Sequence, residues 1–171
     1  MAKPVQFVVL LIAACLVAGV FGALHNQLSY SVGPAYFEDL KFTQFGIPED
    51  QRNRIGAALV GWRASWWMGL LLGLPIFGLA VVLIPQRHVL ALGAGALFIA
   101  LFCAMVGALI GLLLGLLGKS LPLIADLLAE LPPDTGFRRA ALMHEGSYLG
   151  GAVGGGIALW TIWRARRSLN A

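Results

Sequence analysis

Long apolar runs with few charges inside them constrain this chain more than any other feature of its sequence. The runs cover about residues 5–24, 48–84, 89–118 and 138–163. A helix of about 20 apolar residues is long enough to cross the hydrocarbon core of a bilayer. The composition agrees, because 59% of the residues are hydrophobic and 12% are charged, whereas a soluble domain is about a quarter charged. The sequence therefore predicts an all-α membrane protein, a four-transmembrane-helix bundle in a single polytopic domain, 1–171.

The first run, 5–24, has three interpretations. The segment that ends at Cys15 is similar to a lipoprotein box, but the residues after it stay apolar where a lipoprotein would turn polar. Val20-Phe21-Gly22 could precede a signal-peptidase site. The run is longer than the 7–15-residue apolar region of a signal peptide. We therefore expect it to be retained as a transmembrane helix.

The first connecting segment, 25–47, combines a strand-like pattern with aromatic residues. Polar and apolar residues alternate from Gln27 to Val32, which predicts a short strand that Gly33-Pro34 ends. Four aromatic residues follow, and so much apolar area is rarely left in water. We expect an ordered outer cap built on these aromatics: Tyr36, Phe37, Phe42 and Phe45.

The second connecting segment, 119–137, carries a short amphipathic pattern. Its apolar positions lie at helical spacing opposite Asp126 and Glu130, so they predict a short helix at the membrane interface. These positions are Leu121, Ile124, Leu127 and Leu128. The helix of 48–84 is expected to begin at Pro48, because proline suits the first helical position.

Glycines recur on one face of each of the last two predicted helices. A stripe of small residues lets two membrane helices approach closely. The first stripe is Gly107, Gly111 and Gly115, and the second is Gly146, Gly150 and Gly154. We expect Gly111 and Gly150 to lie where helices nearly touch.

Basic residues predict the orientation. Lys3, Arg87 and the arginines after the last run flank the membrane segments, and such residues are enriched on the cytoplasmic side. The prediction is a multi-pass protein with both termini in the cytoplasm and both longer segments outside. The lipid bilayer is then the first partner. Nucleic-acid binding is excluded, because the sequence has no basic patch interleaved with aromatic residues.

Ionisable residues recur at one depth near the outer face. Counting about 20 residues, one bilayer crossing, from three cytoplasmic helix ends reaches His25, Arg63 and His144. Glu145 joins this level, and Tyr148 lies one turn from His144 on the same helix face. Charged groups at the mouth of an apolar segment usually face protein or a water-filled cavity. We therefore expect a ligand pocket here, with an ion pair between Arg63 and Glu145.

Tyr36 of the cap completes the predicted ligand-binding set. Two histidines and a carboxylate are ligands that a divalent metal can accept, so His25, His144 and Glu145 are a weak metal candidate. Adjacent helical residues such as His144 and Glu145 point apart, however. No cofactor is required by the sequence.

The chain resembles a family of small, uncharacterised bacterial integral membrane proteins. In that family the first helix ends in His-Asp-Gln, and the motifs that follow appear here in the same order. They are His25-Asn26-Gln27, Tyr36-Phe37, Lys41-Phe42-Thr43-Gln44-Phe45, Ser65-Trp66-Trp67 and the segment from Met143-His144 to Gly151. The chain departs from the pattern at Asn26, where the family has an acid. The resemblance implies a four-helix protein of the bacterial cytoplasmic (inner) membrane and assigns no activity.

Three functions are compatible with this pattern. The first is a non-catalytic binding or accessory subunit with a polar pocket on its outer face, acting with a membrane-protein partner or as a homo-oligomer. The alternative is a membrane-embedded enzyme, with or without a metal, that uses His25, His144 and Glu145. No HExxH, GxSxG or phosphate-binding motif supports catalysis. A transporter is least favoured, because the inner halves of the helices hold almost no ionisable group.

Overall fold

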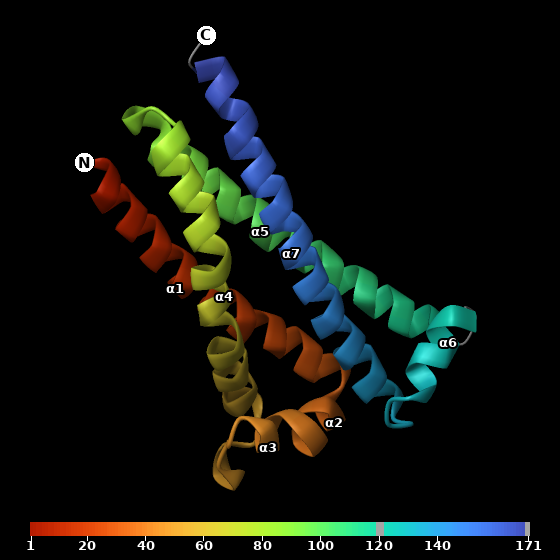
Figure 1. The fold of residues 1–171 in the computed structure, drawn as a ribbon. Helices are drawn as coiled ribbons and strands as arrows, with labels where there is room; N and C mark the ends of the chain where they lie inside the picture. Colours follow the sequence, from red (N-terminus) through yellow and green to blue (C-terminus); the bar gives the residue numbers. More distant parts are fainter. Residues whose placement is uncertain (119–121, 170–171) are drawn as a thin grey trace.

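The computed structural model describes residues 1–118 and 122–169, and every element in these ranges is helical, so the all-α prediction is confirmed (Figure 1). In chain order the elements are α1 (Lys3–Val32), α2 (Pro34–Tyr36), the π-helix η1 (Phe37–Lys41), α3 (Phe42–Gln44), the 3-10 helix η2 (Glu49–Gln51), α4 (Arg54–Leu83), the 3-10 helix η3 (Gln86–His88), α5 (Val89–Leu117), α6 (Pro122–Ala129) and α7 (Thr135–Leu169).

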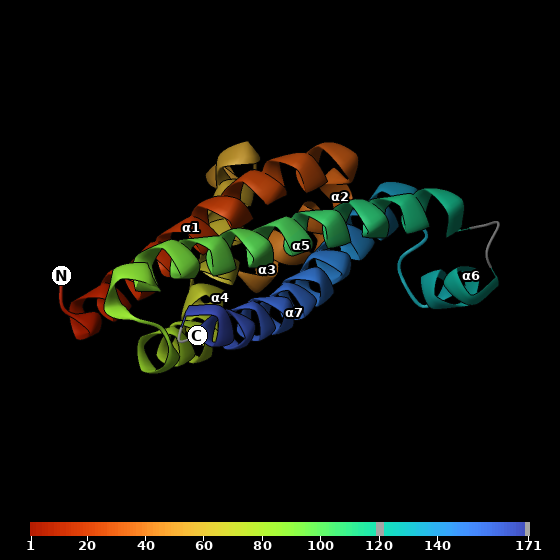
Figure 2. The same ribbon diagram turned by 90° about the horizontal axis from the view of Figure 1, so that it is seen from above.

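The four long helices run alternately in opposite directions. Both termini and the α4–α5 turn lie at one end of the molecule, and α2, α3 and α6 lie at the other (Figures 1 and 2). Two hydrogen bonds hold the N-terminus against that turn. Lys3 Nζ donates to the carbonyl of Val81 at 2.7 Å, and Gln86 Nε2 donates to the carbonyl of Met1 at 3.0 Å.

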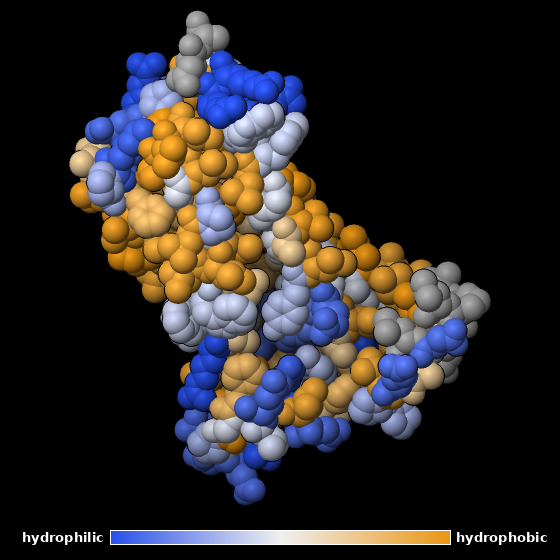
Figure 3. Space-filling model, viewed as in Figure 1, coloured by the Kyte–Doolittle hydropathy of each residue, from blue (hydrophilic) through white to orange (hydrophobic). Residues whose placement is uncertain are grey.

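Three segments of the described chain are long and apolar enough to cross a membrane: Lys3–Val32, Arg54–Leu83 and Gln86–Leu117. The predicted fourth span lies in α7, which is helical over 35 residues but is not among the three. Its many glycines and its charged ends lower its hydropathy. The outer surfaces of the long helices carry apolar side chains, with hydrophilic residues gathered toward the two ends (Figure 3).

The long helices form two closely packed pairs, α1 with α4 and α5 with α7, and contacts between the pairs are fewer. Glycines set both interfaces. A Cβ on Gly22 would collide with the carbonyl of Gly61, and a Cβ on Gly61 with that of Gly22. Such close backbone approach is how helices gain packing energy in lipid, where no hydrophobic driving force acts between them.

The predicted stripes on the last two helices face each other across the α5–α7 interface. A Cβ on Gly111 would meet the carbonyl of Leu142, and a Cβ on Gly150 would meet that of Cys103. The prediction that Gly111 and Gly150 lie where helices nearly touch is therefore confirmed.

Two clusters of buried residues join the helix pairs. The first lies toward the termini and takes residues from all four long helices. Its members are Leu10, Ala14, Ile76, Phe77, Ala80, Ile84, Val89, Ala96, Ala158 and Ile162. The second lies at the opposite end, where the aromatics of the 33–47 segment pack on α4 and α7; its members are Tyr36, Phe37, Phe42, Ile47, Ala57, Val60, Phe137, Ala140 and Ala141.

The first helix is longer than predicted, and the predicted strand from Gln27 to Val32 is wrong. Helix α1 continues to Val32, and the Gly33 amide donates to the carbonyl of Ser29 at 2.9 Å. The alternation is misleading because a second, helical pattern overlaps it. His25, Asn26 and Ser29 are all buried and lie at helical spacing on one face.

Helix α4 begins six residues later than predicted, at Arg54 instead of Pro48. Asn53 is its N-cap, and its side-chain oxygen accepts from the Ile55 amide at 2.8 Å. Asparagine is among the strongest N-caps, because its side chain satisfies an otherwise unpaired helical N–H. Pro48 instead precedes the separate 3-10 turn η2.

Helix α7 begins earlier and ends later than the predicted 138–163. Its start follows from Asp134, whose carboxylate accepts from the Phe137 amide at 2.6 Å in a capping arrangement. Its end extends past the predicted boundary through the arginines to Leu169. The predicted amphipathic helix corresponds to α6, whereas Leu121 and the side chain of Leu127 lie outside the described residues.

Candidate functional site

Two buried histidines from different helix pairs meet in the half of the bundle that carries α2 and α3, away from the termini (Figure 1). His25 of α1 is 4% exposed and His144 of α7 is 7% exposed. Their ring centroids lie 4.8 Å apart with the ring planes nearly perpendicular, at 87°. The histidines therefore join the α1–α4 pair to the α5–α7 pair. The sequence predicted that both would line one pocket, and the structure brings them together.

Two polar residues of α1 near His25, Asn26 and Ser29, form buried hydrogen bonds to other helices. Ser29 Oγ and His144 Nε2 lie 3.1 Å apart, within a fully buried contact. Asn26 Nδ2 donates to the carbonyl of Ala57 in α4 at 2.9 Å. Buried polar groups need such partners, since an unpaired one costs about 1–3 kcal/mol. His25 departs from this rule, because its buried Nε2 has no hydrogen-bond partner among the described residues.

The cap adds an aromatic and a cationic side chain to this cluster. The Tyr36 ring lies 4.9 Å from the His144 ring, and Lys41 Nζ lies 5.3 Å from the centre of the Tyr36 ring. Burial, helped by the nearby Tyr148 and Glu145, raises the pKa of Tyr36, so it is a neutral phenol at physiological pH. Burial lowers the pKa of Lys41, and the nearby carboxylate of Glu145 opposes this change.

A small polar cavity opens beside this cluster, with a volume of about 30 Å³. Residues from α1, the cap, α4 and α7 line it: His25, Asn26, Lys41, Phe45, Val60, Ala64, Ser65, His144, Ser147 and Tyr148. One water occupies about 10–15 Å³ on this measure, so the cavity has room for about two polar atoms. The unpaired Nε2 of His25 belongs to one of its lining residues and gives such an atom a partner.

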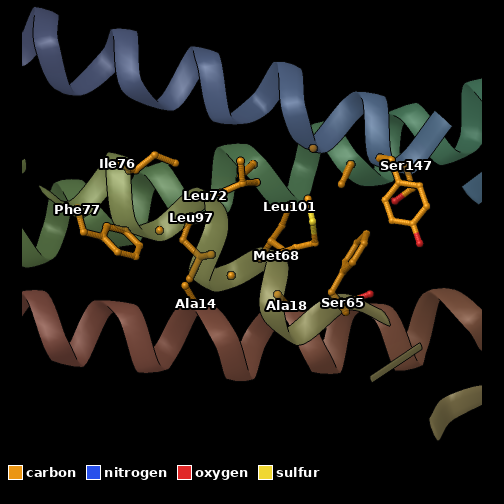
Figure 4. Close-up of a pocket in the computed structure, with 17 residues that line it drawn as sticks. Ala14, Ala18, Ser65, Met68, Leu72, Ile76, Phe77, Leu97, Leu101 and Ser147 are labelled. Atoms are coloured by element: carbon orange, nitrogen blue, oxygen red, sulfur yellow. The ribbon is translucent and has the colours of Figure 1, made fainter. Parts of the chain in front are cut away.

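A second, apolar cavity of about 90 Å³ lies deeper, between the two helix pairs. Figure 4 shows side chains from all four long helices around it, with Ile76 and Phe77 at one end and Ser147 at the other. Its other lining residues include Ala14, Ala18, Met68, Leu72, Leu97 and Leu101, so its wall is almost entirely hydrocarbon.

Three residues line both cavities: Ser65, Ser147 and Tyr148. Ser65 comes from α4 and the other two come from α7, so both helix pairs contribute to the junction. The polar and apolar cavities are therefore neighbours, and the three residues that they share all carry hydroxyl groups. We call the two cavities together the amphipathic site, polar toward the cap and apolar toward the middle of the bundle.

Two of the predicted site residues, Arg63 and Glu145, do not join this site, and a third, Tyr36, contacts His144 but lines neither cavity. Arg63 is exposed and donates to the carbonyl of Phe45 at 3.1 Å, and no ion pair joins it to Glu145 among the described residues. Glu145 is also exposed and does not line the cavity. Counting residues along a helix gives the depth of a side chain but not its direction around the axis, so the two charges share a level without meeting.

The predicted metal set is likewise incomplete. In the part of the chain that the structure describes, no three His, Cys, Asp or Glu side chains are placed to hold a metal ion. His25 and His144 are close, but the neighbouring position of Glu145 turns it away from the pair. One nitrogen of His144 is also occupied by Ser29.

Several residues of the site were not among the predicted ligand-binding residues, although all but Ser29 lie within the sequence motifs given above: Asn26, Ser29, Lys41, Ser65 and Ser147. A helical reading of residues 25–29 would have found the first two, since they share the buried face of His25. Lys41 lies between apolar residues of the aromatic segment, and nothing in its spacing distinguishes it from a solvent-exposed lysine.

Comparison of the chain with protein-family models, with curated proteins and with solved structures finds no match. The resemblance to the family of small bacterial membrane proteins is therefore neither supported nor contradicted, and the function has to be argued from the site.

Proposed function

We propose that the protein is an integral membrane binding protein whose ligand is an amphiphile held between its two helix pairs. The observation that carries this proposal is the junction of a polar and an apolar cavity at Ser65, Ser147 and Tyr148. A polar head beside His25 and a hydrocarbon part between the helix pairs would match the two halves of the site.

The linings of the two cavities support such an occupant. The wall of the 90 Å³ cavity is almost entirely hydrocarbon, so it would contact an apolar chain. The Nε2 of His25, which has no hydrogen-bond partner among the described residues, would gain one from a polar head group.

The proposal includes four membrane spans in a bacterial inner membrane, with both termini cytoplasmic. Helix α7 would be the fourth span, because its glycine stripe packs along α5, itself a candidate span. The site would then face the outer leaflet, with the 33–47 segment as its cap. The arginines near the C-terminus, two of which stack on Trp163, would lie at the cytoplasmic interface.

Binding is favoured over catalysis, because the hydroxyl group next to His144 is inaccessible and the carboxylate of Glu145 lies outside the cavity. Ser29 is the hydroxyl beside His144, but it is fully buried, so a substrate could not reach it. Glu145, the acid of the alternative enzyme hypothesis, lies outside the cavity.

Two leucine substitutions on α7 test the proposal. Gly151 lines the apolar cavity, and a Cβ there would meet only the Ala104 side chain, at 3.8 Å, so Gly151→Leu would project into the cavity. Gly156 has nothing within 4 Å of its Cβ position, so Gly156→Leu is the matched control on the same helix.

The measurement is mass spectrometry of small molecules retained by full-length protein purified in mild detergent. We expect one amphiphile in wild type and in Gly156→Leu, and its loss from Gly151→Leu. Equal retention by both variants, or no retained amphiphile in any of the three, would overturn the proposed function.

A further inference from the structure

We propose that the amphiphile is a long-chain carboxylic acid whose carboxylate binds between Lys41 and His25. This inference rests on the proposed function and adds the chemical class of its ligand. Three properties of the site carry it: the charge of the polar cavity, its size, and the length of the apolar cavity.

The charge of the polar cavity favours an anionic head group. Lys41 is the single Lys or Arg among its lining residues in the described chain, and no Asp or Glu is among them. The Lys41 side chain is partly buried, and its Nζ donates to Gln44 Oε1 at 2.9 Å in an exposed contact, which leaves further N–H donors of the ammonium group. A carboxylate would pair with this ammonium, which forms no ion pair among the described residues although the Glu145 carboxylate lies nearby.

His25 supplies a second hydrogen-bond donor for the head group. Its side chain is 4% exposed and lines the polar cavity, and its buried Nε2 has no partner in the part of the chain that the structure describes. In the neutral tautomer that carries the proton on Nε2, this nitrogen would donate to an acceptor bound in the cavity. A carboxylate has two oxygens and can accept from Lys41 and His25 at the same time. An alcohol head has one oxygen and no charge to pair with Lys41.

The size of the polar cavity excludes a bulky head group. A volume of about 30 Å³ corresponds to about two water-sized positions. The two oxygens of a carboxylate match this space, whereas a phosphodiester with its esterified alcohol would need several times more. A hydrogen-bonded head of this size belongs to a free acid and not to a phospholipid.

The apolar cavity has the length of one acyl chain. Its α4 wall runs from Ser65 to Phe77, twelve residues, which is about 18 Å at 1.5 Å per residue. One leaflet contributes about 15 Å of the 30 Å hydrocarbon core, so the cavity is about as deep as one extended lipid chain. By the conversion used above, about 90 Å³ holds roughly six to nine water- or methylene-sized groups, so the cavity takes part of one chain, and the rest of a long chain would leave through its open side.

The test is equilibrium binding of radiolabelled palmitic acid to full-length protein in detergent, with hexadecanol and lysophosphatidylcholine as matched single-chain probes. Wild type should bind palmitate at least about 10-fold more tightly than either, the range expected for a hydrogen bond to a charged group. Equal affinity for palmitate and hexadecanol would overturn the carboxylate proposal without any variant.

Two substitutions of Lys41 locate the head group. Lys41→Met keeps the stem and removes the charge, so palmitate affinity should fall about 10- to 100-fold while hexadecanol affinity stays unchanged. Lys41→Arg keeps the charge and should retain palmitate binding. The melting temperature of each variant reports on folding.

The outcomes separate this inference from the proposed function. If Gly151→Leu abolishes binding of all probes but Lys41→Met changes none, the amphiphile site stands and the carboxylate assignment fails. If no probe binds to wild type and no amphiphile co-purifies with it, both fail. If lysophosphatidylcholine binds most tightly, the head group is a phospholipid's and the carboxylate assignment is wrong.

Discussion

Gly107 of α5 and Gly146 of α7 block each other's side-chain positions. A Cβ on either glycine would collide with the carbonyl oxygen of the other. The contact is reciprocal, so neither helix can carry a larger residue here without moving. The same arrangement joins Gly22 and Gly61 in the other helix pair. Each pair is thus closely packed through glycines, and the amphipathic site lies where the two pairs meet.

Overpacking this interface should destabilise the protein. Gly150→Leu places a side chain against the Cys103 carbonyl, and we expect a loss of about 1–3 kcal/mol, seen as a lower melting temperature in detergent. Gly156→Leu, on the exposed face of the same helix, should leave the melting temperature unchanged. Equal effects of the two substitutions would show that this glycine contact does not hold the helices together.

The close packing could be predicted from the sequence because membrane helices associate through small residues at fixed spacing. The four-residue period of Gly107, Gly111 and Gly115 specifies a helix face without any knowledge of the fold. Long apolar runs likewise specify helices, because every backbone polar group in lipid must be satisfied within the segment.

The site was harder to predict because it depends on direction around a helix. With 3.6 residues per turn, each step turns a side chain by about 100°, so neighbours at one depth face different surroundings. His144 points to the cavity, whereas Glu145 is exposed. The predicted starts of helices α4 and α7 were wrong because capping was not visible in the pattern. Capping by Asn53 and Asp134 depends on single side-chain hydrogen bonds, which the hydrophobic pattern does not record.

The Ser29 hydroxyl should matter for stability as the partner of His144. Ser29→Ala leaves the buried Nε2 of His144 without its hydrogen bond, and we expect a loss of about 1–3 kcal/mol. Ser31 is the matched control, since its exposed hydroxyl donates to the Gln27 carbonyl and accepts from Arg54 where water can replace both partners. Thermal unfolding of both alanine variants in one detergent measures the difference, and similar curves would contradict a structural role for the Ser29–His144 contact.

Asn26 acts as a donor, so an aspartate should not replace it. Asn26→Asp puts a carboxylate opposite the Ala57 carbonyl, where the amide now donates at 2.9 Å. Loss of this bond leaves two buried acceptors facing each other, and we expect destabilisation of about 1–3 kcal/mol or more at neutral pH. Asn53→Asp should be tolerated, because Asn53 accepts through its side-chain oxygen and a carboxylate can do the same. A stable Asn26→Asp protein would show that the donor role is dispensable.

The proposed orientation predicts which connections reach each side of the membrane. Arg87 in the α4–α5 turn should be cytoplasmic, and Asp126 in α6 should be external; both side chains are exposed. The experiment replaces Cys15 and Cys103 by alanine, places one cysteine at position 87 or 126, and treats intact cells with a membrane-impermeant maleimide. We expect labelling at 126 only, and labelling of both after the membrane is permeabilised.

Because the two positions lie at opposite ends of the bundle, labelling at 87 alone would invert the orientation and place the cap and the amphipathic site in the inner leaflet. Labelling at both positions in intact cells would mean that α5 does not cross the membrane.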